Sequence, residues 1–416
     1  MLTPMPNREL DSIAIIGQGY VGLPLAMSAV NAGWKVFGID LDEGKIENLR
    51  KGVSPVEDIP DSQVQLALHQ ELYEPSTDFK RVSQASVVAI CVPTPLDDLL
   101  EPDLTMLKSA VKSISPHLSK ESLIVSESTS FPGTLRNVIK PIIMELEQNR
   151  SVGLKFACAP ERVNPGDKVW NQGNTPRLVG GLDSGSLESA VNFYKQICNS
   201  VVSVSSPEVA EAAKLLENTF RLVNIALVNE LAQACSASGL SVHEVISAAS
   251  TKPYGFMPFY PGVGIGGHCI PVDPSYLTSW ADGVGISLNL TKAASTVSRN
   301  MPSYVAKRAI KLAKGISNPK ILILGVAYKP GLGDVRETPA LDLKKALEES
   351  GAQVVWHDPL VKNWENTTPV GLDEDYDVAI LATNHPGMEL SLLKNDLKPL
   401  LDCTNSKVTG KKVFLL

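Results

Sequence analysis

Short apolar runs alternate with helix-like stretches in the first part of the chain. Ser12–Ile16 leads into GQGYVG, and LPLAMSAVNAG then has the three-to-four-residue apolar spacing of a helix. Further apolar runs predict strands at residues 35–40, 86–91, 122–126 and 155–159. Strands that alternate with helices predict a mostly parallel sheet that is covered on both faces.

The middle of the chain has a different pattern. Residues 208–238 contain neither Gly nor Pro, and their apolar positions recur every three to four residues, which predicts one long helix. Such a helix would span roughly 45 Å and suits a connector between domains or a dimer interface, although a buried core helix is equally compatible. Residues 252–274 are rich in Gly and Pro and predict a packed irregular loop, a type that is often functional.

A second α/β unit follows another helical stretch at 293–314. Its strands are predicted at 320–325, 353–358, 376–382 and 412–416. A chain of 416 residues suits two or three domains at roughly 100 to 200 residues each. We therefore expect an α/β fold with two Rossmann-like, doubly wound parallel-sheet domains joined by a long central helix, divided at 1–205, 206–315 and 316–416.

Composition narrows the class of protein. The 38 Lys and Arg against 45 Asp and Glu give a net charge of −7, so we expect neither nucleic acid nor an anionic membrane as a partner. The chain has no signal-like apolar start and no run near the ~20 apolar residues that cross a bilayer, so we expect a cytoplasmic protein. Its six cysteines form no C-x-x-C pair, which predicts free thiols and no metal site.

The sequence GQGYVG matches a dinucleotide-binding turn. Gly17, Gly19 and Gly22 lie between a predicted strand and a predicted helix, and Asp40 ends the next strand. The glycines would allow the backbone to approach a pyrophosphate at the helix N-terminus, and Asp40 would accept hydrogen bonds from a ribose. Because a carboxylate repels a 2′-phosphate, we expect NAD in preference to NADP. A merely structural tight turn is the alternative.

The second α/β unit lacks this fingerprint. After Gly325 the chain continues VAYKPGLGDVRETP, where Lys329 and Arg336 could reach the phosphates of a different nucleotide at the carboxyl end of a strand. For either residue alone, a solvated surface charge is the alternative.

Cys269 is the best candidate for a nucleophile among the cysteines. It lies in GIGGHCIPVDP, between His268 and Asp273, where glycines expose the backbone. A structural thiol is equally compatible with the spacing. Cys91 and Cys158 occur in apolar strands and are expected to be inert.

Polar residues on the long helix and at strand ends could complete a site. Lys214 and Asn218 share one helix face, either as a solvated stripe or as an ammonium and an amide that stabilise an oxyanion. Thr129 and Glu161 each follow a predicted strand, where a site would draw its residues.

Taken together, the motifs resemble the UDP-sugar 6-dehydrogenase family, whose members oxidise UDP-glucose or UDP-N-acetylhexosamines twice to uronic acids. The resemblance covers nearly the whole chain and rests on seven blocks in order: GQGYVGLPLA, CVPTP, ESTSFPGT, APERVNPGD, KLLENTFRLVNIALVNELA, PGVGIGGHCIPVDP and GVAYKPGLGDVRETPA.

The resemblance implies an N-terminal NAD-binding Rossmann domain, a central dimerisation and substrate segment, and a C-terminal UDP-binding domain in a homodimer. It implies a thiohemiacetal and then a thioester on Cys269. The implied catalytic residues are Cys269, Lys214, Asn218, Asp273, Thr129 and Glu161. The implied NAD contacts are Gly17, Gly19, Tyr20, Val21, Gly22, Asp40, Lys45, Thr94, Thr129 and Arg336. The implied substrate contacts are Glu161, Arg162, Val163, Asn164, Lys214, Asn218, Tyr260, Gly264, Gly266, His268 and Lys329.

Two blocks differ from glucose-specific members. Arg162-Val-Asn-Pro-Gly166 and Gly267-His-Cys-Ile-Pro-Val-Asp273 resemble the N-acetylhexosamine branch, and KPYGFMPFYPG resembles its N-acetylglucosamine enzymes. We therefore expect UDP-N-acetylglucosamine as substrate, with UDP-N-acetylmannosamine or UDP-glucose as alternatives. Val272 replaces a Lys that the glucose enzymes use near cofactor phosphate.

Two other functions fit parts of the sequence. A two-electron hydroxyacid dehydrogenase would need no cysteine, and Cys269 in its Gly-rich loop argues against it. A non-catalytic sensor of NAD or a nucleotide sugar would be favoured by loss of the nucleophile or its neighbours, which are all present.

Overall fold

A computed structural model describes residues 11–146, 153–163, 169–267, 270–393, 398–406, 408 and 412–416. The contacts within the chain divide it into two compact units, which we describe separately. Unit 1 is Met1–Leu216 with Ser275–Trp280, and unit 2 is Glu217–Pro274 with Ala281–Leu416.

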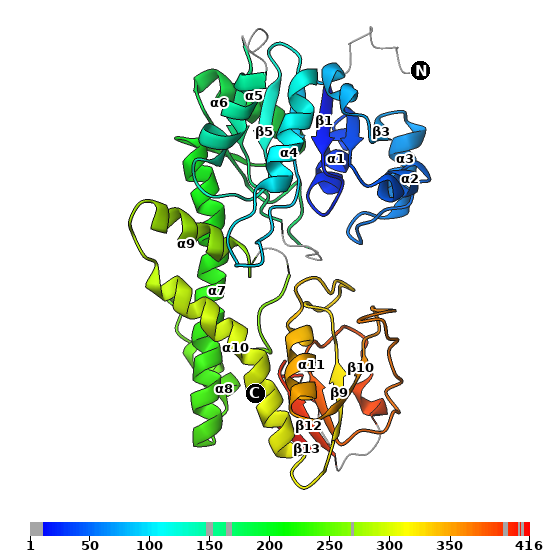
Figure 1. Ribbon diagram of the computed structural model, residues 1–416, viewed down its shortest axis with the longest axis vertical. Coiled ribbons are helices and arrows are strands. Elements are labelled where there is room, and N and C mark those ends of the chain that lie inside the picture. Colours follow the sequence, from blue (N-terminus) through cyan, green and yellow to red (C-terminus); the bar gives the residue numbers. More distant parts are fainter. Residues whose placement is uncertain are drawn as a thin grey trace. The chain divides into compact units, whose positions relative to one another are not determined.

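Unit 1 is built on a twisted sheet whose described strands follow the order β3-β2-β1-β4-β5-β6-β7-β8 (Figure 1). Every neighbouring pair is parallel except β6 and β7, which are antiparallel. The strands are β1 (Ser12–Ile16), β2 (Lys35–Ile39), β3 (Tyr73–Ser76), β4 (Val87–Ile90), β5 (Leu123–Ser126), β6 (Lys155–Cys158), β7 (Arg177–Gly181) and β8 (Val201–Val204).

Helices cover both faces of this sheet, as buried parallel strands require. Apolar side chains of β1, such as Ile13 and Ile15, pack with α1 and α6 in one core, and α4 contacts β4 from the other side. The helices are α1 (Gly22–Asn31), α2 (Glu43–Arg50), α3 (Asp61–His69), α4 (Thr105–Ile114), α5 (Lys140–Leu146) and α6 (Ser184–Ile197), with short turns η1 (Phe79–Gln84), η2 (Ser115–His117) and η3 (Leu135–Ile139).

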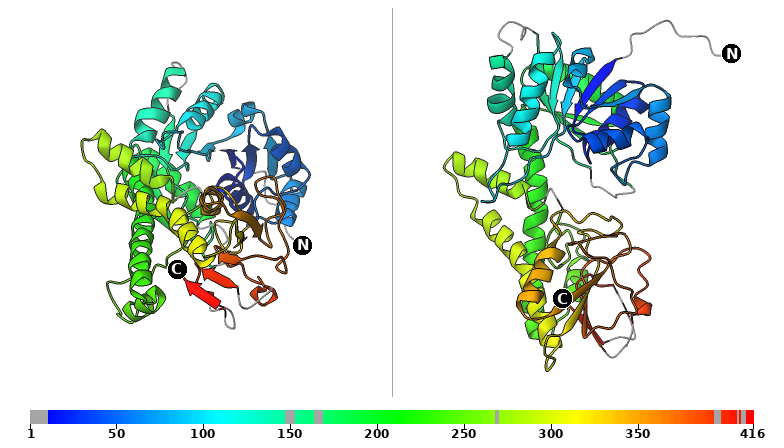
Figure 2. Two further views of the ribbon diagram at one scale, coloured as in Figure 1. Left: turned by 60° about the horizontal axis from the view of Figure 1, so that its bottom comes forward. Right: turned by 45° about the vertical axis from the view of Figure 1, so that its right-hand side comes forward.

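Unit 2 contains a smaller, wholly parallel sheet in the order β10-β9-β11-β12-β13. Helices α10 and α11 lie side by side against one face of it, as both views show (Figures 1 and 2). The strands are β9 (Lys320–Leu324), β10 (Gln353–His357), β11 (Val378–Leu381), β12 (Pro399–Asp402) and β13 (Lys412–Leu415). The remaining elements are α8 (Val242–Ala249), α10 (Asn289–Leu312), α11 (Pro339–Glu349) and η4 (Leu390–Leu392).

Two helices contribute residues to both units. Helix α7 runs from Pro207 to Ser238 as one uninterrupted element of 32 residues, as the lack of Gly and Pro predicted, and α9 spans Asp273–Gly283. Among the described residues, no helix is long and apolar enough to span a membrane.

The predicted strands and helices are present, with small differences at their ends. The helix expected at 293–314 is α10, which begins four residues earlier. The expected packed loop is irregular, but its first part is exposed, including Tyr254 and Met257. Packing begins further along, where glycines allow the chain to approach its neighbours.

Candidate active site

The turn between β1 and α1 has the geometry of a dinucleotide site. Gly17 has a φ of +96°, and a Cβ there would lie 2.6 Å from the carbonyl oxygen of Cys91. A Cβ on Gly22 would lie 1.8 Å from the oxygen of Gly17, so the helix can start here only with glycine. Gly19 has no atom within 4 Å of a Cβ position, which leaves its backbone open to a ligand. Gly17 and Gly22 thus shape the turn, and Gly19 offers the space for a pyrophosphate.

Asp40 follows β2 directly opposite this turn. Its Oδ2 accepts the backbone N–H of Gln18 at 2.8 Å and the Nζ of Lys45 at 2.7 Å, and its Oδ1 accepts the N–H of Asp42. Burial raises the pKa of Asp40, but the bonds from Lys45, Gln18 and Asp42 outweigh it and lower the pKa below its usual value. The carboxylate is therefore ionised at neutral pH, which fits a ribose diol and opposes a 2′-phosphate.

The other proposed NAD contacts of unit 1 lie near the carboxyl ends of strands. Thr94 is buried and donates its hydroxyl to the carbonyl of Thr129 at 2.7 Å. Val21 precedes the first residue of α1, and the hydroxyl of Tyr20 donates to Glu57. These contacts fix the loops that follow β1, β4 and β5.

Glu161 and Lys214 lie close enough in unit 1 to influence each other. Glu161 follows β6, and its Oε1 accepts the backbone N–H groups of Arg162 and Val163 at 2.6 Å each. Burial raises the pKa of Glu161. The charge of Arg177, with a smaller contribution from Lys214, lowers it, and the net pKa is below the usual value. Lys214 is itself buried, so α7 carries no solvated stripe at this position. Arg162 also donates to the carbonyl of Pro176.

Asn218 and Asp273 meet within unit 2. The Nδ2 of Asn218 on α7 donates to Oδ2 of Asp273, the buried first residue of α9. The residues expected between these elements, His268 and Cys269, lie outside the described residues, as does Asn164 of the earlier loop.

The Gly-rich loop packs on the loop that follows β9. Added Cβ atoms on Gly266 would lie 2.7 Å from Glu337 and Tyr328, and one on Gly264 would lie 3.0 Å from Pro339. Only glycine therefore permits this approach, which holds the segment before Cys269 against the loop that carries Lys329 and Arg336. Tyr260, earlier in the same segment, stacks on His243 at 6.2 Å between ring centroids.

Lys329 and Arg336, the two cations of unit 2 that we expected to contact a nucleotide, lie on that loop. Arg336 is exposed and pairs with Asp334 through its Nη2 and Oδ2 at 2.6 Å, and Lys329 is half-buried. Asp334 is buried, so the pair fixes the direction in which the guanidinium leaves the loop.

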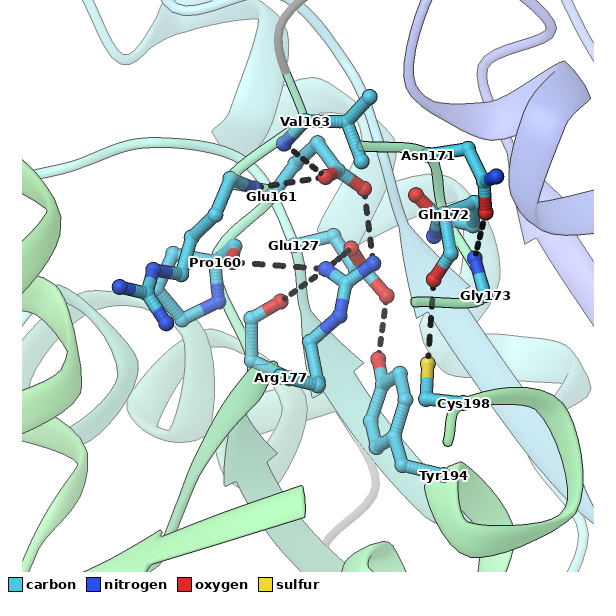
Figure 3. A network of polar contacts seen from close by, with 12 residues as sticks. Glu127, Pro160, Glu161, Val163, Asn171, Gln172, Gly173, Arg177, Tyr194 and Cys198 are labelled. Atoms are coloured by element: carbon cyan, nitrogen blue, oxygen red, sulfur yellow. Dashed lines mark hydrogen bonds and ion pairs between the residues drawn. The ribbon is translucent and has the colours of Figure 1, made fainter. Parts of the chain in front are cut away.

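Sequence reasoning missed a buried ionic network next to Glu161 (Figure 3). Arg177, at the start of β7, contacts both Glu161 and Glu127, and Tyr194 of α6 donates to Glu127. The only signal in the sequence was that charged residues directly adjoin strongly apolar strands, which does not reveal which charges pair.

Comparison with known proteins gives matches along most of the chain. Three profiles of the UDP-glucose/GDP-mannose dehydrogenase family match: the NAD binding domain at residues 11–198, the central domain at 208–300 and the UDP binding domain at 322–405. The chain belongs to this family. It is an NAD-dependent UDP-sugar dehydrogenase, an oxidoreductase.

Relatives with different sugar specificities are equally similar to the chain. A UDP-N-acetyl-D-glucosamine 6-dehydrogenase of Pseudomonas aeruginosa is 34% identical over 393 residues, covering 90% of each chain. A UDP-N-acetyl-D-mannosamine dehydrogenase of Methanococcus maripaludis strain C7 is 34% identical over 419 residues, covering 98% of this chain and 93% of its own. The solved structure of the UDP-D-ManNAc dehydrogenase from Pyrococcus horikoshii has a TM-score of 0.87 at 29% identity, covering 97% of this chain and 98% of its own.

Proposed function

We propose that the protein oxidises the C6 hydroxymethyl group of UDP-N-acetylglucosamine to the carboxylate. Two segments, Arg162-Val-Asn-Pro-Gly166 and Gly267-His-Cys-Ile-Pro-Val-Asp273, resemble the N-acetylhexosamine branch. The observation that carries the choice of N-acetylglucosamine within that branch is the segment KPYGFMPFYPG at 252–262, which resembles the N-acetylglucosamine enzymes. UDP-N-acetylmannosamine is the second candidate, because a relative of that name matches with the same identity.

Cys269 is the proposed nucleophile. Its thiolate adds to the C6 aldehyde to give a thiohemiacetal, whose oxidation leaves a thioester that water hydrolyses. NAD, when bound, accepts one hydride in each oxidation, so the alcohol, two NAD⁺ and one water give the carboxylate, two NADH and three protons.

The surrounding residues supply charge and proton transfer in this proposal. Lys214 as an ammonium and Asn218 as an amide stabilise the developing oxyanion, and the bond from Asn218 to Asp273 supports the orientation of that amide. Thr129 and Glu161 handle the hydrolytic water. Gly17 to Gly22, Asp40, Lys45 and Thr94 hold NAD, and Lys329 binds the UDP phosphates.

A panel of UDP-sugars tests the proposal. NADH formation is measured with UDP-glucose, UDP-galactose, UDP-N-acetylglucosamine, UDP-N-acetylgalactosamine and UDP-N-acetylmannosamine. The highest kcat/KM is expected for UDP-N-acetylglucosamine, since polar groups placed for the acetamide lose partners when it is absent. Preference for UDP-N-acetylmannosamine selects the second candidate, and preference for UDP-glucose rejects the branch. No turnover with any of the five would favour a non-catalytic sensor.

The variant Cys269→Ser tests the covalent step. Overall turnover should fall by roughly two orders of magnitude or more, with NAD and UDP-sugar affinity nearly unchanged. Near-wild-type NADH production per folded molecule would remove Cys269 from the mechanism.

We also propose a homodimer that uses helix α7. Large apolar side chains along α7 are exposed at spacings of seven and four residues, which places them on one face: Val209, Leu216, Phe220, Leu227 and Leu231. A second copy of the same helix has the matching stripe, so the occupant we infer is another chain of this protein.

Light scattering after size exclusion tests the homodimer. Leu227→Lys places a charge in the stripe and should shift the protein toward monomer, whereas Leu99→Lys, a change of an even more exposed leucine away from α7, should not. A wild-type monomer at micromolar concentration would contradict the proposal.

A further inference from the structure

Arg177 lies between two carboxylates inside unit 1 (Figure 3). Its Nη1 donates to Oε2 of Glu127 at 2.7 Å and its Nη2 donates to Oε2 of Glu161 at 2.8 Å. The arginine side chain is 3% exposed and that of Glu127 is fully buried. Because Glu127 follows β5, Glu161 follows β6 and Arg177 begins β7, the guanidinium joins the carboxyl ends of two strands to the start of the next.

The carboxylate of Glu161 has a fixed direction. Oε1 accepts two backbone N–H groups from Arg162 and Val163, and Oε2 accepts the guanidinium of Arg177. Because donors hold both oxygens, the carboxylate cannot rotate. A flexible glutamate on the surface has no such restraint. A group that must meet a water molecule in one orientation benefits from this restraint.

The far side of Arg177 is anchored as well. Glu127 accepts the hydroxyl of Tyr194, and the guanidinium carbon of Arg177 lies 5.4 Å from the centroid of the Tyr194 ring. Nη1 of Arg177 also approaches the carbonyl oxygens of Ala159 and Pro160 at 3.3 and 3.4 Å. The guanidinium of Arg177 is therefore held by the Tyr194 ring against its face and by hydrogen bonds at both Nη1 and Nη2.

Two carboxylates share this single guanidinium, so they compete for it. Burial is the main cause that raises the pKa of Glu127 to about 7, and the charge of Glu161 adds to it. Arg177 lowers this pKa but does not outweigh them. The pKa of Glu161 is instead lowered, because Arg177 and the backbone N–H groups outweigh burial. Among the described residues, the other titratable groups that interact with the network are Cys91, Cys158, Tyr194, Cys198 and Lys214. A proton taken up near neutral pH thus resides on Glu127, and Glu161 stays ionised.

We propose that Arg177 is a positioning residue that holds the Glu161 carboxylate ionised and correctly directed, with Glu127 and Tyr194 as its anchor. The inference rests on the proposed role of Glu161 in thioester hydrolysis. In that step the water oxygen bonds to the carbonyl carbon, the carbon–sulfur bond breaks to release the Cys269 thiolate, and Glu161 takes a proton from the water and passes it to solvent.

The test separates the oxidations from the hydrolysis. With the full-length enzyme, NAD and the best UDP-sugar of the panel, rapid mixing records the initial NADH burst, and intact mass records the adduct on Cys269. Arg177→Lys keeps a charge but loses the fork, and Arg177→Met with Glu127→Gln removes the arginine without leaving Glu127 as an unpaired buried charge. Both should retain the burst, accumulate the adduct and lose steady-state turnover by roughly tenfold to a hundredfold, a partial loss of the roughly hundredfold or more that a positioned proton-transfer group contributes.

The pH profile provides a readout that a merely structural role would not change. Loss of the cation raises the pKa of Glu161, so the acid limb of the steady-state rate should move upward by about one pH unit or more in the double variant, and by less in Arg177→Lys. Phe193 is buried and packs on Tyr194, so Phe193→Leu controls for a weakened core without removing a charge. Arg136→Met controls for the loss of one positive charge. Neither control should move the acid limb.

The outcomes distinguish the inference from the function on which it rests. If Glu161→Gln has normal hydrolysis, or if the wild type oxidises no UDP-sugar, the proposed function fails. If Glu161→Gln stalls with adduct on Cys269 while both Arg177 variants keep the wild-type rate and pH profile per folded molecule, the role of Arg177 alone is overturned.

Discussion

The turns that follow β1 and β9 use the same backbone arrangement with different results. In each, the first residue after the strand is a glycine with positive φ, Gly17 at +96° and Gly325 at +78°. Each glycine donates its N–H to the last residue of the neighbouring strand, and the next residue donates to an aspartate, Asp40 or Asp358.

The two aspartates then diverge. Asp40 is paired with Lys45, and its side chain is 12% exposed. Asp358 is fully buried, and its Oδ2 accepts the N–H groups of Val326 and Ala327 and the Nε2 of His385 at 3.0 Å. Asp40 thus stays partly exposed, as a contact to the ribose would require, whereas Asp358 is enclosed by the protein.

The segment that follows each glycine also differs between the two units. In unit 1 the helix starts at Gly22, directly after the turn, and its N-terminus favours a pyrophosphate. In unit 2 a loop runs from Gly325 to Thr338 before α11 begins, and the N–H of Gly331 donates to Nδ1 of His385. We therefore expect that a Rossmann-like turn alone does not bind a dinucleotide, and that the helix start and an accessible carboxylate are also needed.

Alanine at the packed glycines should have the largest effect. A Cβ on Gly22 or Gly325 would lie 1.8 or 2.0 Å from a backbone oxygen, so each variant should lose on the order of 4 kcal/mol of unfolding free energy. Gly19→Ala, which adds a Cβ in open space, should unfold like the wild type but bind NAD more weakly. Urea unfolding and NAD titration measure both, and wild-type NAD affinity in Gly19→Ala would argue against the turn as the pyrophosphate site.

Replacing each aspartate by asparagine should separate stability from binding. Asp358→Asn disrupts a buried pair and should cost about 2 to 4 kcal/mol of unfolding free energy without changing cofactor choice. Asp40→Asn should cost about 1 kcal/mol or less but should narrow the preference for NAD over NADP. Unfolding curves and kcat/KM with both cofactors are the measurements. An unchanged NAD preference in Asp40→Asn would contradict its assignment to the ribose.

Acid should reduce the contribution of Asp358. Burial raises its pKa, but His385 and the backbone N–H groups of Leu360 and Ala327 lower it to a net value below the usual one. Because the folded pKa is the lower one, this stabilisation is complete above the unfolded value of about 3.9 and is lost as pH falls through the folded pKa. The difference in unfolding free energy between wild type and Asp358→Asn should therefore shrink between pH 5 and pH 2. A constant difference would show that the charge of Asp358 is not what stabilises the turn.

Lys45→Met should have the smallest effect on stability. The pair with Asp40 is partly exposed, so its loss should cost about 0.5 kcal/mol at low salt and almost nothing at 1 M salt. The buried Asp358 pair should show no such salt dependence. The measurement is the unfolding free energy of Lys45→Met and Asp358→Asn at low salt and at 1 M salt. The same salt dependence in both variants would contradict the prediction.

The sequence predicted the local parts of this comparison but not its long-range contacts. Ser12–Ile16 and Lys320–Leu324 are continuous apolar runs followed by glycine, which is enough to predict a buried strand and a turn. The pair of His385 with Asp358 joins residues 27 positions apart, and that of Arg177 with Glu127 joins residues 50 apart. No periodicity encodes such pairings, because they depend on the order of strands in the sheet.

The same limit applies to the candidate site. The glycines and Asp40 could be predicted because the turn requires glycines at fixed positions and a carboxylate at the end of the next strand, and this spacing is visible in the sequence. The burial of Lys214 and the contact of Asn218 with Asp273 depend on how α7 and α9 pack, which their apolar periodicity does not specify. Strand β7 was not predicted, and its antiparallel pairing with β6 depends on contacts that the sequence of Arg177–Gly181 does not specify.

Calorimetric titration of NAD into the full chain shows whether the first turn binds the cofactor and the second does not. One NAD should bind per chain. Gly19→Val should abolish that binding, and Gly331→Asn, which tolerates the left-handed backbone at this position of the loop after the second turn, should leave it unchanged. Two NAD molecules per chain, or wild-type binding by Gly19→Val, would contradict the account.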